Sequence, residues 1–194
     1  MKELHRRPGG RNARVRAAVL EAALQEVVAV GYARMTMEGV ARRAGVNKTT
    51  LYRRWGSREA VLVDAFRERG QEQVPIPDTG SLREDLLAIA RAVVDGSNLP
   101  EVQAVVRAVA SETADSPLVD ASRQFWAERF VLDGQVVQRA IDRGEASADV
   151  DPKTVIEAVL GPIYFRVLLT AEPPDDAFVL RLVDLAVAAA RNGF

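Results

Sequence analysis

The sequence contains no cysteine and only one histidine, His5. Without cysteine the chain has no disulfide, no iron–sulfur cluster, no zinc–cysteine site and no thiol nucleophile. A lone histidine does not supply convergent metal ligands, so we expect no metal site and no cofactor. Only scattered carboxylates remain as acid, base or nucleophile, and we therefore predict that the protein is not an enzyme.

Long apolar runs are also missing. No run approaches the roughly 20 residues that are needed to cross a bilayer. The Arg-rich start of the chain is not followed by the apolar segment of a secretory signal. With 48% hydrophobic and 27% charged residues, the composition is typical of a globular protein with a sizeable core. We expect a cytoplasmic protein that has no membrane partner.

The charges that are present are unevenly distributed. Residues 1–70 hold 15 Lys or Arg and 7 Asp or Glu, a net charge of +8, although the whole chain is close to neutral at -1. Residues 71–194 hold 11 basic and 20 acidic residues, a net charge of -9. This asymmetry indicates that the first part faces a polyanion, although random segregation of solvated charge would give the same totals.

Helical periodicity dominates the chain, and no segment alternates convincingly as a strand. Apolar residues recur at steps of three and four, which predicts an all-α fold of nine helices. The predicted helices cover residues 12–30, 36–45, 47–55, 57–70, 81–95, 100–111, 116–143, 152–171 and 176–191.

Capping residues and a break divide these helices into domains. Thr36, Asn47 and Ser57 are good N-caps, and Ser81 with Glu84 has the pattern of a capping box. Residues 71–80 are rich in turn-forming residues and mark the clearest break. We predict a flexible basic tail at 1–11, a helix-turn-helix domain at 12–70 with its three-helix core, and a helical bundle at 71–194.

The segment at residues 36–55 carries the most specific signal. Gly45 permits a sharp turn between two short helices, because a residue without Cβ adopts left-handed dihedrals easily. Leu51 and Trp55 supply the apolar side of the second helix. Its remaining side is basic and hydroxyl-rich, with Lys48, Thr49, Thr50, Tyr52, Arg53 and Arg54.

Such a side chain set suits the major groove of DNA. Lys48 can donate to a guanine edge or to a phosphate, and a threonine methyl can contact thymine. Helix N-termini bind phosphates, and Thr36 and Arg58 lie at two of them. The alternative is an ordinary helical hairpin with a solvated basic face. Gly39, inside the first helix of the pair, costs about 1 kcal/mol relative to alanine.

At these residues the sequence resembles the DNA-binding domain of the tetracycline-repressor (TetR) family. The resemblance covers about residues 12–66 and rests on Gly31-Tyr32, Thr36, the run from Ala44 to Trp55, and Ser57-Arg58-Glu59. The predicted DNA-binding residues are Thr36, Asn47, Lys48, Thr49, Thr50, Tyr52, Arg53, Arg54 and Arg58. Arg53 and Arg54 match positions that some members use. The positions that the resemblance implies for DNA contact are Thr36, Lys48, Thr49, Thr50, Tyr52 and Arg58.

The chain after residue 80 resembles a TetR-type ligand-binding and dimerisation domain more weakly. The run from Gly161 to Leu169 is similar to that of an actinobacterial-type subgroup. The last two predicted helices are apolar over more than one narrow stripe, so each must bury more than one side. The family forms a four-helix dimer interface there, which implies a homodimer through 152–171 and 176–191. The alternative is a fully intramolecular core.

Aromatic residues concentrate in two of the C-terminal helices, where they line either an apolar ligand pocket or an ordinary core. Arg129 shares their side; it either pairs with Asp133 or meets an acidic or carbonyl-bearing ligand, and Arg166 raises the same alternative. The candidate ligand-binding residues are Phe125, Trp126, Arg129, Phe130, Tyr164, Phe165 and Arg166.

The sequence thus predicts a DNA-binding transcriptional regulator that acts as a dimer on a palindromic operator in double-stranded DNA. The leading interpretation is a repressor that an unknown small-molecule effector releases from an inverted repeat. The alternative is a TetR-like regulator, an activator included, that has no small-molecule effector.

Overall fold

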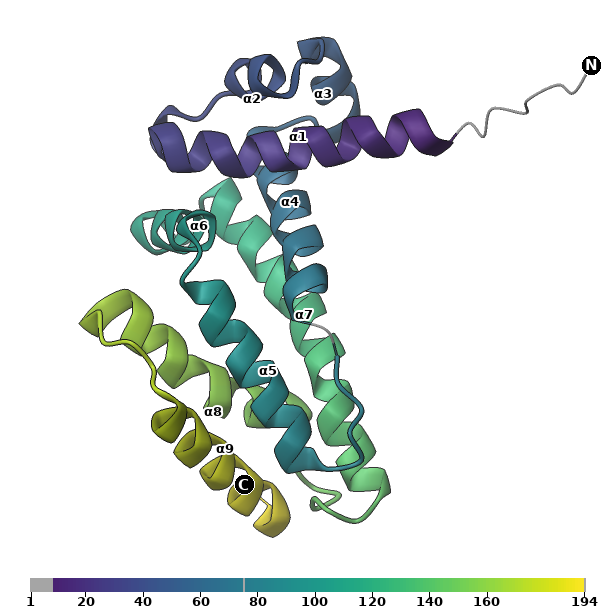
Figure 1. Ribbon diagram of the computed structural model, residues 1–194, viewed down its shortest axis with the longest axis vertical. Helices are drawn as coiled ribbons and strands as arrows, with labels where there is room; N and C mark the ends of the chain where they lie inside the picture. The colour runs from purple at the N-terminus through teal and green to yellow at the C-terminus, as the bar shows by residue number, and fades with distance from the viewer. Residues whose placement is uncertain (1–8, 75, 194) are drawn as a thin grey trace, which may run out of the picture. The chain divides into compact units, whose positions relative to one another are not determined.

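The computed structural model describes residues 9–74 and 76–193, and over them its regular secondary structure is helical, without a strand, which confirms the all-α prediction (Figure 1). None of the described helices is long and apolar enough to span a membrane. The helices are α1 (Gly9–Val30), α2 (Met37–Ala44), α3 (Lys48–Trp55), α4 (Arg58–Gln73), α5 (Leu82–Ser97), α6 (Pro100–Ser111), α7 (Pro117–Asp142), α8 (Pro152–Phe165) and α9 (Asp176–Asn192). A short 3-10 turn, η1 (Tyr32–Arg34), follows α1, and a π-helical segment, η2 (Arg166–Thr170), follows α8.

The predicted basic tail lies largely outside the described residues, since His5 and the rest of residues 1–8 are not among them. Helix α1 begins at Gly9, three residues before the predicted start. The prediction of a helix at 152–171 corresponds to α8 together with η2, and Ala171, which follows η2, adopts a left-handed conformation with φ 54°.

The described chain falls into two compact units. The first holds the chain up to Glu68 together with Ala104–Ala121, and the second holds Arg69–Gln103 with the chain from Ser122 onward. The predicted division near residue 70 had placed 104–121 in the C-terminal bundle. The structure differs because α4, α6 and α7 each continue from one unit into the other, and Val105 and Leu118 are buried in the core of the first.

The first unit is built on α1, whose apolar stripe packs against α2 (Figure 1). Side chains cap the next three helices as predicted. The Thr36 Oγ1 accepts from the Gly39 N–H at 3.0 Å, and the Asn47 Oδ1 accepts from the Thr49 N–H at 2.9 Å. The Ser57 Oγ accepts from the Ala60 N–H at 3.2 Å. These caps matter because helices of eight residues are too short to be stable alone.

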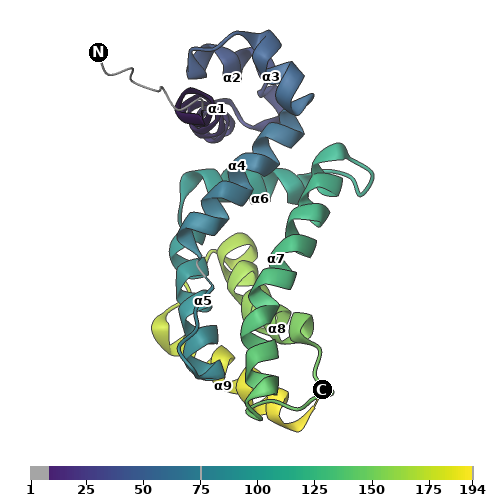
Figure 2. The same cartoon turned by 90° about the vertical axis from the view of Figure 1, so that its right-hand side faces the viewer.

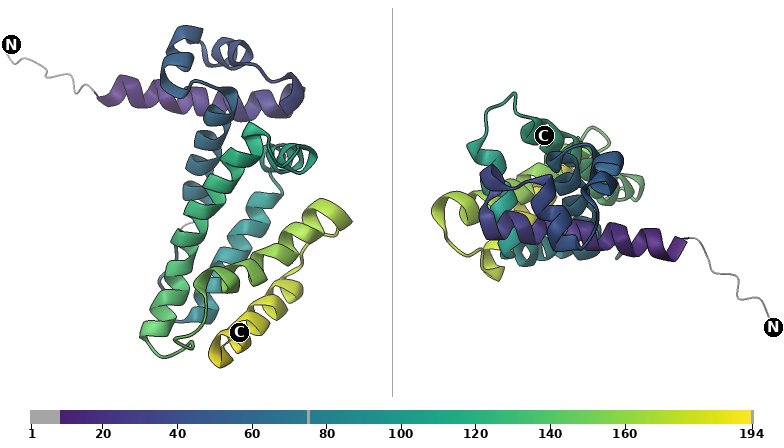
Figure 3. Two further views of the ribbon diagram at one scale, coloured as in Figure 1. Left: turned by 180° about the vertical axis from the view of Figure 1, so that it is seen from behind. Right: turned by 90° about the horizontal axis from the view of Figure 1, so that it is seen from above.

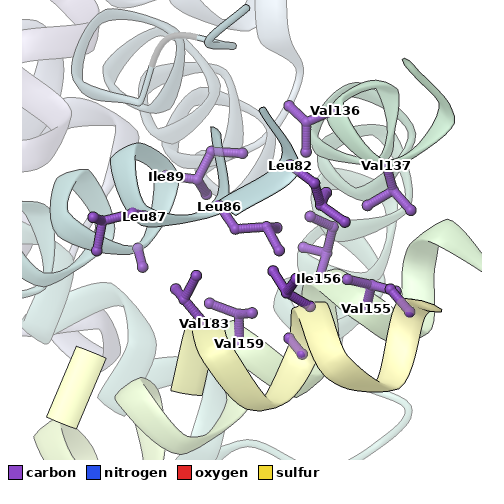
Figure 4. Close-up of a cluster of buried hydrophobic side chains, with 14 of the residues drawn as sticks. Leu82, Leu86, Leu87, Ile89, Val136, Val137, Val155, Ile156, Val159 and Val183 are labelled. Atoms are coloured by element: carbon purple, nitrogen blue, oxygen red, sulfur yellow. The ribbon is translucent and has the colours of Figure 1, made fainter. Parts of the chain in front are cut away.

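In the second unit α8 and α9 lie side by side, and α5 packs against both (Figures 2 and 3). The core between them is dense in branched aliphatic side chains. Figure 4 shows Leu86 of α5, Val136 of α7, Ile156 and Val159 of α8, and Val183 of α9 meeting in one cluster. Each is at most 1% exposed, so these helices form one continuous hydrophobic core.

The capping box predicted at Ser81 is wrong. The Ser81 side chain makes no capping hydrogen bond, and the Leu82 N–H instead donates to the Glu145 carboxylate at 2.8 Å. Asp85, which is fully buried, accepts from the Thr79 N–H at 2.8 Å. The start of α5 is therefore fixed by a carboxylate 63 residues away, which local sequence pattern does not reveal.

The fourth helix also runs past its predicted end at Gly70 to Gln73. The Arg129 side chain donates to the Gly70 carbonyl at 3.3 Å and to the Val74 carbonyl at 2.8 Å. Both carbonyls lie at the end of α4, where backbone partners become few; the Gly70 carbonyl also accepts from the Val74 N–H at 3.0 Å. A buried guanidinium thus satisfies the end of α4.

Candidate nucleic-acid interface

The turn between α2 and α3 has the geometry that the sequence predicts. Gly45 adopts φ 66° and ψ 32°, a left-handed conformation that favours glycine. The Val46 N–H donates to the Ala41 carbonyl at 3.0 Å across this turn. Two eight-residue helices therefore follow each other with a fixed direction change, and α2 contacts both α1 and α3.

Two side chains on the inner face of α3 anchor this helix to the rest of the first unit. Leu51 is fully buried in the core of the first unit. The Trp55 indole N–H donates to the Asp64 carboxylate of α4 at 2.9 Å, and the Arg16 guanidinium of α1 binds the other oxygen at 2.8 Å. Burial alone would raise the pKa of Asp64, but these donors hold it below its ordinary value. The ionised Asp64 carboxylate of α4 thus links α1 and α3 to α4.

The outward face of α3 carries the predicted recognition residues. Lys48, Thr49, Tyr52, Arg53 and Arg54 are exposed, and Tyr52 is 45% exposed despite its aromatic ring. Thr50, which the sequence analysis places on the same face, is half-buried and lies nearer the inner side of the helix. Asn47, whose side chain caps the helix, is exposed at its start.

Two of the basic side chains have neighbours on this surface. The Lys48 Nζ lies 3.7 Å from the Glu38 carboxylate of α2. The Arg54 guanidinium lies over the Trp55 ring, 5.1 Å from its centroid. Glu38 was not among the predicted site residues; its only sequence signal is its place in the first turn of α2, next to the capping Thr36. The Glu38 carboxylate therefore reduces the positive potential at the outward face of α3.

Gly39 has a packing reason. A Cβ at this position would lie 3.0 Å from the Glu26 Cδ and nearer still to its Oε1, and 3.2 Å from the Thr36 Oγ1. Glu26 is only 5% exposed and is held by Arg43, whose Nη2 lies 2.9 Å from its carboxylate. The glycine therefore lets α2 approach a buried, ion-paired carboxylate of α1.

Arg58 differs from the other predicted DNA contacts, because its guanidinium is bound within the protein. Its Nη1 donates to the Tyr32 carbonyl at 3.0 Å and to the Met35 carbonyl at 2.8 Å. Its Nε donates to Glu59 at 2.8 Å, and the guanidinium lies 4.3 Å from the Tyr32 ring centroid. Arg58 thus ties the start of α4 to the turn between α1 and α2.

The Glu59 carboxylate completes this cluster by accepting from the Tyr32 hydroxyl at 2.8 Å. Burial and that hydrogen bond raise the pKa of Tyr32 to about 12. Although its own burial acts in the opposite direction, hydrogen bonds from Arg58 and Tyr32 lower the pKa of Glu59. The cluster therefore stays in one charge state across the neutral range, which suits a structural role.

The second unit brings together four of the predicted ligand-binding residues. The Trp126 ring packs edge-on against Phe125 at 5.2 Å and Tyr164 at 5.6 Å, and stacks on Phe130 at 5.5 Å between centroids. Burial raises the pKa of Tyr164 to about 12, so its hydroxyl stays neutral. This aromatic cluster joins α7 to α8.

Arg129 pairs with Asp133, which is the first of the two alternatives that the sequence leaves open. Two of its nitrogens bind the Asp133 carboxylate at 2.9 and 2.6 Å, and both residues are buried. Together with its bonds to two α4 carbonyls, this pairing uses the guanidinium within the fold.

The last two predicted residues point elsewhere. Phe165 is 55% exposed, and Arg166 lies 3.7 Å from the Phe178 ring centroid and 3.6 Å from the Glu172 carboxylate. Successive residues of a helix point about 100° apart, so neither follows Tyr164 into the aromatic cluster. Over the described residues no group of three His, Cys, Asp or Glu side chains is placed to hold a metal ion.

Comparison with known proteins matches two segments of the chain to regulator families. Residues 19–65 match the family described as "Bacterial regulatory proteins, tetR family", and residues 76–186 match "Tetracyclin repressor-like, C-terminal domain". The second match includes the run that resembles an actinobacterial-type subgroup.

Individual relatives agree. The chain is 37% identical to the HTH-type transcriptional regulator AqdR of Rhodococcus erythropolis over 81% of its own length and 76% of the relative's. It is 33% identical to the DNA-binding transcriptional repressor TetR of Mycobacteroides abscessus over 87% and 89% of the two lengths. The solved TetR family transcription regulator SCO0332 has a TM-score of 0.74 and 35% identity, covering 90% of this chain and 97% of that one.

Proposed function

Because the chain belongs to the TetR family of DNA-binding transcriptional regulators, we propose that it is a repressor which a small-molecule effector releases from an inverted-repeat operator. Members of this family are regulators rather than enzymes. A repressor of the same family in Mycobacteroides abscessus is among its relatives, which supports the sign of the regulation. A bacterial regulator acts where the chromosome lies, so we place this one in the cytoplasm.

The observation that carries the proposal is the outward face of α3. Its five exposed side chains offer donors and hydroxyls, while Leu51 and Trp55 fix the helix from behind. Such a pre-positioned face suits direct contact with base edges in the major groove. We propose Lys48, Thr49, Tyr52 and Arg53 as the principal contacts, with the capped N-terminus at Thr36 binding a phosphate.

The remaining proposed contacts are the half-buried or partly engaged residues. Thr50 borders the inner side of α3, Asn47 caps it, and Arg54 stacks on Trp55. The Arg58 guanidinium already donates to two backbone carbonyls, so we assign it mainly to positioning α4. This ranking distinguishes residues that recognise DNA from residues that orient the recognition helix.

A dimer explains the apolar surface of α8 and α9. Phe165 is 55% exposed, Leu169 is 74% exposed and Leu185 is 68% exposed, which is unusual for large apolar side chains. Gly161 lies among them, and a Cβ there would meet nothing within 4 Å. An open glycine on an apolar face permits the close approach of another helix. Two subunits joined here would present two α3 helices to half-sites about 34 Å apart.

The effector site that we propose is the region of the Phe125, Trp126, Phe130 and Tyr164 cluster. An effector releases DNA only if it binds one conformation of the dimer more tightly than the other. Arg129 binds a carbonyl at the end of α4 beside this cluster, so an effector that displaces the rings would also shift the end of α4. The second candidate function is a regulator without an effector, in which the same rings are ordinary core.

Selection of bound sequences from random double-stranded DNA tests the DNA-binding part. We expect an enriched inverted repeat, and enrichment of single, non-repeated sites would refute the palindrome. Screening small molecules for release of that selected operator then tests the effector. Release by at least one compound, accompanied by a rise in the midpoint of thermal unfolding, is the expected result.

The dimer has a direct test in Gly161→Arg. Because a side chain at this position has open space in the subunit, the variant should remain folded but sediment as a monomer. Ala110→Arg, an exposed position of α6 in the first unit, is the matched control and should remain dimeric. A dimeric Gly161→Arg would place the interface elsewhere.

A further inference from the structure

A surface cavity of about 550 Å³ lies between α7 and the first turn of α8, and it shares Phe130 with the aromatic cluster. Its wall is mainly apolar and includes Ala127, Phe130, Val131 and Pro152. Val131 is 71% exposed, which leaves a branched aliphatic side chain at the mouth of the cavity without cover from its own subunit.

Local packing sets how closely the two helices that line the cavity approach each other. A Cβ on Gly134 would lie 3.3 Å from the Pro152 Cβ, so the glycine lets the start of α8 approach α7 closely. Lys153 borders the opening, with its Nζ 5.6 Å from the Phe130 ring centroid and 3.4 Å from the Glu157 carboxylate. Its aliphatic stem can therefore line the cavity while the charge remains in water.

Five exposed residues follow one another along α8 and η2 at intervals of four. They are Lys153, Glu157, Gly161, Phe165 and Leu169. Residues four apart are neighbours on successive turns, so the row forms a ridge that is inclined to the helix axis. This row begins at the cavity, because Lys153 belongs to both, and ends in two large apolar side chains. Gly161, the one position without a side chain, stands in its middle.

A twofold axis at Gly161 would pair the two ends of this row. In an isologous interface each contact occurs twice, with residue i against j and j against i. Antiparallel α8 helices that cross at Gly161 set Glu157 opposite the partner's Phe165 and Lys153 opposite the partner's Leu169. The partner's exposed apolar end is thereby brought to the cavity of the first subunit, and the reverse contact follows by symmetry.

We propose that the cavity between α7 and α8 is a socket for the second copy of this chain, which receives the partner's Phe165 and Leu169. The inference rests on the homodimer proposed above and extends its interface onto α7. It assigns one occupant to the open apolar cavity and one destination to the two exposed apolar side chains of the same chain. The recognition is apolar, with Lys153 covering the edge of the inserted side chains.

Disulfide crosslinking tests this contact cleanly because the natural chain has no cysteine. Under mild oxidation, Val131→Cys with Leu169→Cys should give a covalent species of twice the 21.2 kDa subunit mass. Each single variant should give far less, because the two sites meet only each other. Val28→Cys with Leu169→Cys is the control, since Val28 is 46% exposed but lies in the first unit.

A second single variant separates failure of the socket from failure of the dimer. Gly161→Cys should crosslink to itself if the twofold axis passes there, because a disulfide needs Cα atoms about 4.4–6.8 Å apart. Crosslinking of Gly161→Cys without crosslinking of the Val131 and Leu169 pair would overturn the socket and leave the dimer standing. A monomeric wild-type chain in sedimentation would overturn both.

Val131→Arg gives a readout in solution. The exposed position tolerates the change, so the subunit should stay folded while dimer dissociation becomes at least about tenfold easier, the loss that corresponds to one modest apolar contact. Val28→Arg should leave dimerisation unchanged. If Val131→Arg leaves dimerisation intact but alters release of the operator by an effector, the cavity is a small-molecule site and the socket is refuted.

Discussion

The Trp55 indole N–H donates to the Asp64 carboxylate at 2.9 Å, and this hydrogen bond ties the recognition helix to the rest of the first unit. The other carboxylate oxygen accepts from Arg16 at 2.8 Å. One side chain of α4 therefore joins α1 and α3. Since an eight-residue helix has little stability of its own, its orientation toward DNA depends on such contacts.

Asp64→Asn should lower the free energy of unfolding by about 1 kcal/mol at neutral pH, because it weakens a partly exposed charged hydrogen-bond pair. The pKa of Asp64 is lowered in the folded protein, so the carboxylate's contribution is complete above its ordinary value of 3.8. It is lost as pH falls through the lower folded pKa. The gap between wild type and variant should therefore narrow below about pH 4.

Urea unfolding followed by tryptophan fluorescence at several pH values measures this gap. Asp149→Asn, at an exposed position of the second unit, serves as the control and should show almost no gap at any pH. A gap for Asp64→Asn that stays constant from neutral to acid pH would contradict the role of ionised Asp64.

Gly39→Ala should destabilise the protein although alanine is the better helix former. Helix propensity alone predicts a gain of about 1 kcal/mol. The new Cβ would press on the Glu26 carboxylate, which burial and Arg43 hold in place, and overpacking of this kind costs about 1–3 kcal/mol. Thermal or urea unfolding measures the sign of the change.

Gly70→Ala is the matched comparison on α4. Its Cβ would meet the Phe125 ring at 3.7 and 3.8 Å, which is ordinary van der Waals contact. This variant should gain up to about 1 kcal/mol. A stabilising Gly39→Ala would show that Glu26 moves aside freely and that the glycine has no packing reason.

Lys48→Ala and Arg58→Lys should separate recognition from positioning. Lys48 is exposed on α3, so its loss should weaken operator binding by about tenfold and leave unfolding unchanged. Arg58→Lys keeps the positive charge but loses the planar fork that reaches the Tyr32 and Met35 carbonyls, so it should lower stability. Binding titrations and unfolding curves on both variants measure this contrast. The reverse pattern would make Arg58 the DNA contact and Lys48 the structural residue.

Arg129→Ala should cost about 3–5 kcal/mol of stability, because it leaves the Asp133 carboxylate buried without a partner. Replacing both residues, Arg129→Met with Asp133→Leu, removes the buried charges together and should recover much of that loss. Chemical denaturation of the single and double variants measures both. An unchanged stability in Arg129→Ala, together with an altered effector response, would favour the ligand role instead.

Local chemistry made much of the fold predictable. The caps at Thr36, Asn47 and Ser57 act within three residues, so the sequence pattern contains all that they need. The cap of α5 did not follow its pattern because Glu145, distant in sequence, satisfies Leu82. The boundary between the units was likewise displaced, since α4, α6 and α7 carry their apolar faces through it.

The candidate sites divide in the same way. The exposed face of α3 follows from helical periodicity and from the turn at Gly45 that the sequence shows. Asp64 binds both Arg16 and Trp55, and these residues are too far apart in sequence for a local pattern to predict their contact. Phe165 was grouped with Tyr164 as an aromatic neighbour, although adjacent helical positions face different directions and only Tyr164 packs against Trp126.

The most direct test of the central claim is a fluorescence anisotropy titration of the selected inverted repeat across a salt series, with a scrambled duplex in parallel. The α3 surface predicts an affinity that falls linearly in log–log form as salt rises, and a preference of at least about a thousandfold for the selected site. Lys48→Ala should reduce that preference. Equal affinity for both duplexes, or an affinity independent of salt, would contradict sequence-specific recognition of DNA by this helix.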